Sequence, residues 1–325
     1  MITIYDRPPA GTGLAQAPAP SAIGPATVWI DLVTPTEAEE SLVEHALGIE
    51  VPTRAEMREI EASSRFYAEN GAVYMTAAIV YDIEGPSPKG TVVTFILAGD
   101  RLVTVRYAEP KAFPIFVARA DKGGADCTSG ASVMIGLVET LIARNADLIE
   151  RLQDEAERLA GQLFDIKGGS ASRNRRLDVV LKATGKLGSG AGLAEESAVS
   201  MALLLNYFHQ SLRSRHEQHP VIERIEDARA DVASLTEHLR FLTSRTGFLL
   251  SATLGTINIE QNQIIKLFSV VAVLLMPPTL IASIYGMNFR HMPELHLPLG
   301  YPVALGLMLA SALLSFLYFK RKGWL

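Results

Sequence analysis

The sequence predicts an α+β membrane protein, in which an α/β domain precedes a long stalk helix that continues into the first of two C-terminal transmembrane helices. Three observations predict this class. Runs rich in β-branched and aromatic residues alternate with turn residues in the first third of the chain. An apolar repeat of helical period fills the middle, and two nearly uncharged blocks lie close to the C-terminus.

The two uncharged blocks are residues 264–284 and 301–319, and Lys266 is the only charged residue in either. A helix needs roughly 20 apolar residues to cross the hydrocarbon core of a bilayer, so both blocks are predicted to be transmembrane helices. The segment 320–325 is basic, whereas the connector 285–300 holds one basic side chain, Arg290. Because cytoplasmic segments are enriched in Lys and Arg, both termini of this multi-pass chain are predicted to be cytoplasmic.

Composition excludes several classes of protein. The 325-residue chain has a formal charge of −5, which argues against a nucleic-acid partner, and a single cysteine, Cys127. One cysteine excludes a disulfide framework or a multi-cysteine zinc site within the chain, and we interpret it as a buried, inert thiol. The start of the chain lacks the pattern of a secretory signal, and its Pro-, Ala- and Gly-rich composition over 8–25 predicts a flexible tail over 1–26.

Residues 27–130 are predicted to form the α/β domain. A capped amphipathic helix is expected within 35–62, because Thr36 and Glu37 precede apolar residues at helical spacing. Strands are expected where β-rich runs lie between turn signals, at 27–32, 72–83, 91–99 and 101–107.

Residues 131–220 are predicted to form an acidic pair of antiparallel helices. The first has leucines on one side and Glu150, Asp154 and Glu157 on the other. The second covers about 173–216, where the glycine run 185–192 is expected to interrupt or loosen it. This run is not interpreted as a phosphate-binding loop, because no strand precedes it and the Walker lysine pattern is absent.

The stalk helix is predicted over 221–284. Its apolar residues alternate spacings of three and four, which is typical of coiled coils, and the segment 221–276 contains no proline. A continuous helix over these 64 residues is about 95 Å long at ~1.5 Å per residue.

The segment 258–302 carries a specific resemblance. Its centre is Tyr285-Gly286-Met287-Asn288, followed by Met-Pro-Glu-Leu at 292–295 and Gly-Tyr-Pro at 300–302. These residues resemble the signature region of the CorA family of magnesium transporters, in which GMN is the selectivity motif. The segments 49–67 and 316–325 are also similar to that family. The zinc-transporting branch of the superfamily usually varies the residues after its GxN motif, so the sequence is more similar to the branch that carries Mg²⁺, Co²⁺ and Ni²⁺.

The resemblance implies a homopentameric channel in the inner (plasma) membrane, with a funnel-shaped α/β/α cytoplasmic domain and a pore lined by the first transmembrane helix. Mg²⁺ is then both the transported and the regulatory ion. Hydrated divalent cations, membrane lipid and further copies of the chain are the implied partners. No organic cofactor or enzyme activity is expected, since no nucleophile–base cluster or ATPase motif is present.

By the same resemblance, Gly286, Met287 and Asn288 form the selectivity filter, where Asn288 contacts the hydrated ion through its water shell. Offsets of three or four residues from 265 to 279 independently predict one helical stripe. A polar amide at each end of an apolar helix also suits a water-filled path. The implied pore-lining residues are Asn262, Ile265, Phe268, Ala272, Met276, Thr279 and Tyr285.

Further roles follow from charge. Glu294 is the only acid in the connector and is expected to attract cations to the outer mouth. The resemblance implies that Lys320, Arg321 and Lys322 form a basic ring around the cytoplasmic pore, although anchoring at the lipid headgroups is an alternative.

Regulation departs from the family pattern at one position. Some members hold a regulatory Mg²⁺ with an Asp eleven residues before the inner pore Asn, and this chain has Ser251 there. Asp227 and Asp231 are alternative ligands, as is the acidic side of the first helix of the pair. Two other functions remain open on sequence alone, a zinc transporter of the same superfamily and a membrane-anchored coiled-coil sensor. A plain anchor does not need a polar GMN segment.

Overall fold

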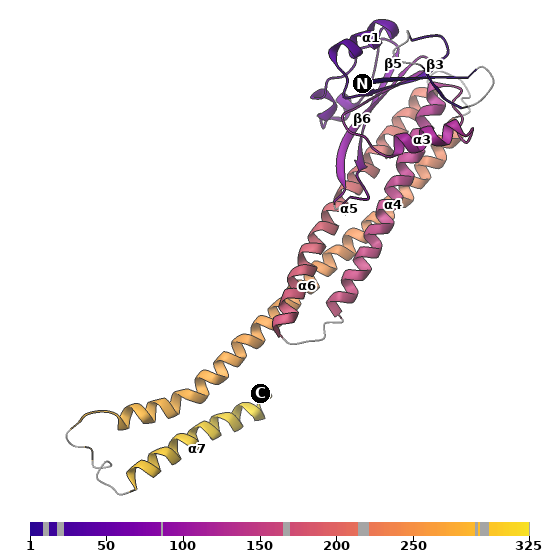
Figure 1. The fold of residues 1–325 in the computed structure, drawn as a ribbon. Helices are drawn as coiled ribbons and strands as arrows, with labels where there is room; N and C mark the ends of the chain where they lie inside the picture. The colour runs from indigo at the N-terminus through magenta and orange to yellow at the C-terminus, as the bar shows by residue number, and fades with distance from the viewer. Residues whose placement is uncertain are drawn as a thin grey trace. The chain divides into compact units, whose positions relative to one another are not determined.

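The computed structural model describes residues 1–8, 13–17, 23–85, 87–164, 170–213, 221–289, 292 and 299–324. It divides into two compact units. Unit 1 comprises Met1–Asp165 with Val180–Leu250, and unit 2 comprises Ile166–Val179 with Ser251–Leu325. Figure 1 shows the elements of both units, which are described separately below.

Unit 1 contains a seven-stranded mixed sheet in the order β2-β1-β3-β7-β6-β5-β4. The pairing of β3 with β7 is parallel, and the other pairings are antiparallel. The four predicted runs correspond to β3, β5, β6 and β7. The strands are β1 Ile2–Asp6, β2 Ala15–Gln16, β3 Thr27–Val33, β4 Phe66–Glu69, β5 Ala72–Tyr81, β6 Lys89–Ala98 and β7 Arg101–Arg106.

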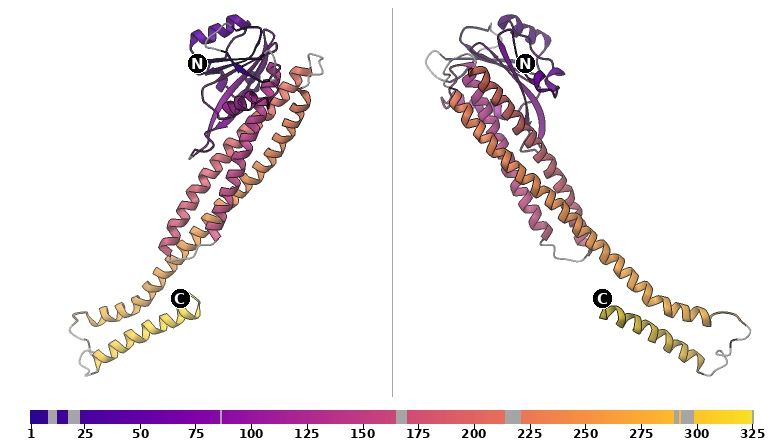
Figure 2. Two further views of the ribbon diagram at one scale, coloured as in Figure 1. Left: turned by 45° about the vertical axis from the view of Figure 1, so that its right-hand side comes forward. Right: turned by 180° about the vertical axis from the view of Figure 1, so that it is seen from behind.

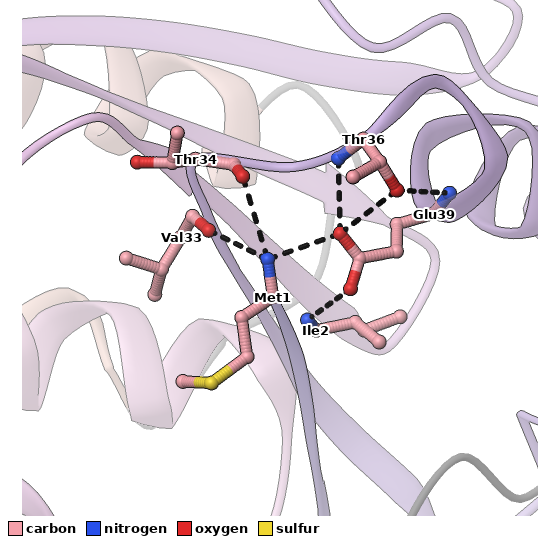
Figure 3. Close-up of polar contacts among 6 residues, drawn as sticks. All are labelled: Met1, Ile2, Val33, Thr34, Thr36 and Glu39. Carbon is pink, nitrogen blue, oxygen red and sulfur yellow. Dashed lines mark hydrogen bonds and ion pairs between the residues drawn. The ribbon is translucent and has the colours of Figure 1, made fainter.

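The prediction of a flexible tail is wrong for the first residues of the chain, because β1 pairs with β3 in register from Ile2↔Leu32 to Ile4↔Ile30. The amine of Met1 donates to the carbonyl of Val33 (2.7 Å) and pairs with the carboxylate of Glu39 (3.0 Å), as Figure 3 shows. The strand forms because its backbone groups bond to partners on β3. The local sequence, a short β-rich run followed by prolines, does not reveal these distant partners. Parts of the remaining tail lie outside the described residues.

Helix α1 (Glu37–Leu47) has the predicted cap at Thr36. The Glu39 amide donates to the Thr36 hydroxyl, and the Thr36 amide donates to the Glu39 carboxylate, which forms a capping box. Gly48 ends the helix in the left-handed region (φ 65°), where a side chain is disfavoured. Two short elements, η1 (Glu56–Arg58) and α2 (Ala62–Arg65), lead to β4.

The sheet has a core on each face. Its α1 face buries an apolar cluster that includes Ile30, Tyr74 and Met57. Its other face packs on helices α3 (Ala112–Asp121), α4 (Gly130–Phe164), α5 (Ser170–Arg213) and the first part of α6 (Ile222–Tyr285), and Figures 1 and 2 show these long helices side by side. Cys127 is fully buried in this second core, and burial raises the pKa of its thiol to about 12. Both observations agree with the interpretation of Cys127 as a buried, inert thiol.

The glycine run 185–192 does not interrupt α5, which is continuous through it, so the expected break is wrong. Tertiary packing outweighs the low helix propensity of glycine here. A Cβ on Gly190 would meet the Leu152 side chain of α4 at 3.0 Å. At that position the absence of a side chain lets α4 and α5 approach closely.

A buried ion pair joins β3 to β7. Both nitrogens Nε and Nη2 of Arg106 donate to the Asp31 carboxylate, the closest contact being 2.7 Å, and the two side chains are 9% and 5% exposed. The Thr104 hydroxyl donates to Asp31 (2.7 Å) and accepts from the indole of Trp29 (2.9 Å). Arg106 also lies 4.4 Å above the ring of Phe113. The network ties the parallel strand pair to the helical layer.

Unit 2 contains the C-terminal part of α6 and helix α7 (Gly300–Arg321). The helix α6 matches the predicted stalk in its bounds, and α7 continues the second block through Lys320 and Arg321, because cations at a helix C-terminus are favourable. Pro277 and Pro278 lie inside α6, which bends near its end (Figure 2). Proline removes backbone donors and distorts a helix, which accounts for a bend there.

The carboxylate of Glu39 predicts a local pH dependence of stability. Its pKa is lowered to about 2, chiefly by the Thr36 amide and further by the Met1 amine. The folded pKa lies below the ordinary value near 4.5, so this contribution is present above that pH and is lost as pH falls toward 2. We expect acid to increase hydrogen exchange in β1 and α1 over this range. The variant Glu39→Gln should remove that dependence, whereas Glu37→Gln, at an exposed position on the same turn, should retain it. A Glu39→Gln protein in which acid still increases hydrogen exchange as it does in the unsubstituted chain would contradict the prediction.

Candidate ion pathway

In unit 2, one side of α6 faces α7. The half-buried or buried side chains of α6 recur at offsets of three and four, and the most buried is Val270, which is 2% exposed. Figures 1 and 2 show α7 beside this part of α6. On α7, Ala304 and Phe319 are correspondingly buried. The α7-facing stripe of α6 consists of Lys266, Val270, Leu274, Pro277, Ile281 and Tyr285.

The predicted pore stripe lies on the opposite side of the helix. At 100° per residue, positions 265 to 279 of that stripe fall about 180° from the α7-facing stripe. Ile265, Phe268 and Met276 are 61%, 70% and 67% exposed in the single chain, and Ala272 and Thr279 are also exposed. Tyr285 instead lies with the α7-facing stripe, so its implied place in the pore stays a prediction. The geometry therefore leaves this apolar stripe, here called the free stripe, uncovered by α7, together with flanking apolar side chains such as Leu267 and Leu275.

The GMN segment follows directly on the last turn of α6. The amide of Gly286 donates to the carbonyl of Ala282 (2.9 Å), and that of Met287 to Ile284 (3.3 Å). A Cβ on Gly286 would lie 3.1 Å from the Ala282 carbonyl oxygen, so glycine allows this close approach rather than a left-handed turn. Met287 and Asn288 are exposed, and the Asn288 amide is thus available to solvent at the end of the free stripe.

At the other end of the two spans, Lys266 contacts the C-terminal segment. Its ammonium lies 5.3 Å from the ring centroid of Trp324 and donates to the carbonyl of Gly323 (3.4 Å). Trp324 stacks on Phe319. From the sequence, Lys266 was identified only as the single charge in its block, and this contact was not predicted. An aromatic residue beside the basic segment was the available signal, since cations favour indole rings.

The other predicted site residues are dispersed. Asn262 is exposed on α6, and so are Ser251, Asp227 and Asp231. Glu294 lies outside the described residues. Among the residues that the structure describes, no three His, Cys, Asp or Glu side chains come together as a metal site.

The arrangement defines a class of protein. The helices α6 and α7 are long and apolar enough to cross a membrane, and in the most apolar stretch of each helix few side chains are buried within the chain, unlike the core helix of a soluble protein. Together with unit 1, this describes a membrane protein with an α/β domain and two C-terminal spans. The model of the family described as "CorA-like Mg²⁺ transporter protein" matches residues 25–321 of this sequence. The chain therefore belongs to the CorA family.

Relatives support the family over nearly the whole chain. The magnesium transport proteins CorA of Escherichia coli K12 and Yersinia pestis are each 34% identical to it, and that of Sodalis glossinidius is 36% identical, with 92% of this chain and 92% of each relative covered. The complete CorA structure from Methanocaldococcus jannaschii is similar in fold, with a TM-score of 0.76 over 100% of this chain and 99% of that one at 18% identity. The ZntB cytoplasmic domain from Vibrio parahaemolyticus covers 79% of this chain and 97% of its own, with a TM-score of 0.59 at 10% identity.

Proposed function

We propose that this chain forms a homopentameric channel that admits Mg²⁺, and also Co²⁺ and Ni²⁺, through the inner membrane into the cytoplasm. The observation that carries the proposal is the free stripe of α6, which lies opposite α7 and leads to the exposed Asn288. In the proposed oligomer, copies of α6 surround a central axis and turn this stripe toward it. They then form a path with apolar walls and an amide at each end. The magnesium transport relatives favour Mg²⁺ as the ion.

No chemical energy source is required for this function. The entry of a divalent cation driven by about 100 mV, negative inside, is favoured by ~4.6 kcal/mol.

In the proposed orientation both termini are cytoplasmic, and Lys320, Arg321 and Lys322 lie at the inner surface as a basic ring. A cysteine placed at position 299 should then be labelled from outside intact cells, and one placed at 323 should not.

Uptake into proteoliposomes tests the proposal. We expect Mg²⁺ influx that follows an imposed potential and is blocked by hexa-ammine cobalt(III), a mimic of the hydrated ion. Empty liposomes and liposomes with an Asn288→Ala protein are the controls. A sensor would give no influx, and a zinc transporter would carry Zn²⁺ in preference to Mg²⁺, so either result would contradict the proposal.

Cytoplasmic Mg²⁺ is proposed to close the channel by neutralising carboxylates that face one another between subunits, since a hard divalent cation prefers oxygen ligands. Asp227 and Asp231 suit this role. They are exposed, lie one turn apart on α6, and pair with no cation among the described residues. Loss of the ion then lets like charges repel.

Ser251→Asp tests a second position for the regulatory ion, since residue 251 lies about 30 Å along α6 from Asp231. We expect the added carboxylate to shift inhibition to lower Mg²⁺, by about tenfold if it gains one charged contact. Ser251→Asn is the matched control, since it adds a similar volume without charge. Proteoliposome currents at graded internal Mg²⁺ give the measurement. An unchanged Mg²⁺ dependence would place the regulatory ion elsewhere.

A further inference from the structure

A cavity of about 420 Å³ lies in unit 1. Its walls come from the segment around η1, the adjoining ends of β5 and β6, the residues after β7, and helix α5. This volume lies in the range of pockets that hold small organic ligands, and it exceeds what a single inorganic anion fills. Its polar lining consists chiefly of Arg54, Arg58, Thr91, Tyr107, Glu196 and Ser197.

Two guanidinium groups line this cavity. Arg54 and Arg58 are both exposed, and within the part of the chain that the structure describes neither guanidinium has an ion-pair or hydrogen-bond partner. Arg54 lies 5.2 Å from the centroid of the Tyr107 ring, and this stacking restricts its side chain. Unpaired guanidiniums at one cavity suit an anion with several oxygens, because each offers a planar set of donors that matches phosphate or carboxylate.

A buried hydroxyl supports a polar ligand at the same place. Ser197 is 2% exposed, lines the cavity, and has no hydrogen-bond partner among the described residues. One turn further along α5, Ser200 is also buried, but its hydroxyl accepts from the amide of Ala78 (2.8 Å) and so satisfies the edge of β5. The Ser197 hydroxyl is not among the buried side-chain atoms that lack a partner, so it is accessible from the cavity and can bond a ligand there.

We propose that this cavity binds a small organic phosphate. The phosphate contacts Arg54 and Arg58, and the organic part lies against the apolar walls formed by Val92 and Leu193 and within reach of Ser197. The carboxylate of Glu196 at the same cavity opposes an anion, but the two guanidiniums leave a net positive lining. Phosphate is also a group with which Mg²⁺ associates, so such a site links the cytoplasmic domain to the ligands of the transported ion.

Titration calorimetry on the full-length detergent-purified protein tests this inference. Three probes are compared in the presence of a Mg²⁺ chelator: adenosine monophosphate, adenosine and inorganic phosphate. We expect adenosine monophosphate to bind at least about tenfold more tightly than either of the others, since each lacks one half of the recognised structure. Because a chelator is present, the result does not depend on Mg²⁺ transport, and failure of this inference leaves the proposed channel untouched.

Variants at the rim locate the site. Arg54→Gln and Arg58→Gln should each weaken binding of adenosine monophosphate by about tenfold, and both positions are exposed, so the fold is not at risk. Arg58→Lys should retain part of the affinity, and Glu196→Gln should strengthen binding by about threefold. The matched control is Lys186→Gln, which removes one exposed positive charge from the neighbouring cavity of about 500 Å³ and should leave affinity unchanged.

Four outcomes would overturn the inference. These are no binding of adenosine monophosphate at millimolar concentration, equal affinity for adenosine, equal affinity for inorganic phosphate, and insensitivity to both arginine variants. Loss of binding in Lys186→Gln with normal binding in the arginine variants would move the ligand to the other cavity and count against the inference as well.

Discussion

Asn288→Ala is expected to abolish Mg²⁺ uptake while the oligomer remains folded. Mg²⁺ holds its octahedral water shell tightly, so a fast pore recognises the hydrated ion by outer-sphere contacts. Asn288 is exposed after the last turn of α6. In the proposed channel its amide, one from each subunit, would supply an oxygen that accepts hydrogen bonds from coordinated water. Because Asn288 is exposed, its truncation leaves no buried group unpaired, and the loss should appear in flux rather than in stability.

Asn288→Asp separates binding from conduction. A ring of carboxylates holds a divalent cation more strongly than a ring of neutral amides, and conduction requires binding weak enough for exit. We expect tighter Mg²⁺ binding by calorimetry and slower flux in proteoliposomes. Gln263→Ala is the matched control. It removes an exposed amide from α6 at a position on the side of the α7-facing stripe, and it should conduct normally. Near-normal uptake by an assembled Asn288→Ala protein would refute this role of the amide.

Asp31→Ala is expected to destabilise unit 1 by about 3–5 kcal/mol, because it leaves the buried guanidinium of Arg106 without its counter-ion. It also removes the acceptor of the Thr104 hydroxyl. The chain has two tryptophans, so a Trp324→Phe background leaves Trp29 as the only indole, and Trp29 belongs to the same network. Urea unfolding followed by its fluorescence measures the effect.

A surface ion pair gives the control for this prediction. Glu237 and Arg240 pair on α6 at 2.5 Å with both side chains about two-thirds exposed or more. Glu237→Ala should therefore cost no more than about 0.5 kcal/mol. If Asp31→Ala is as mild as this control, then the buried pair contributes no more than an exposed one and the role assigned to it is wrong.

Several elements were predictable because their signals are local. Thr36 caps α1, as the sequence indicated, and its partner in the capping box is Glu39, only three residues away. The apolar blocks and the spacing along the stalk also act between near neighbours, which is why α6 and α7 agree closely with the predicted bounds. The GMN segment was recognisable from consecutive residues.

Other elements were not predictable because their partners are distant in sequence. The strand β1 exists through its register with β3, and Arg106 finds Asp31 across 75 residues. The glycine run of α5 stays helical, and Gly190 within it packs against Leu152 of α4, a contact that no local propensity reveals. The cavity of Arg54 and Arg58 likewise joins five segments, so no single stretch of sequence signals it.

The sequence by itself determined the family, the spanning helices, the long helix and the polar segment after it, because hydropathy, periodicity and a contiguous motif are properties of neighbouring residues. The tertiary structure decided which side of α6 is free. Periodicity gave one stripe from Ile265 to Thr279 without saying what it faces. Only the packing of α7 on the opposite side, centred on Val270, distinguishes the two stripes. The burial of a side chain depends on its packing partner, and here that partner is α7, which follows later in the chain and is placed beside α6 by the fold.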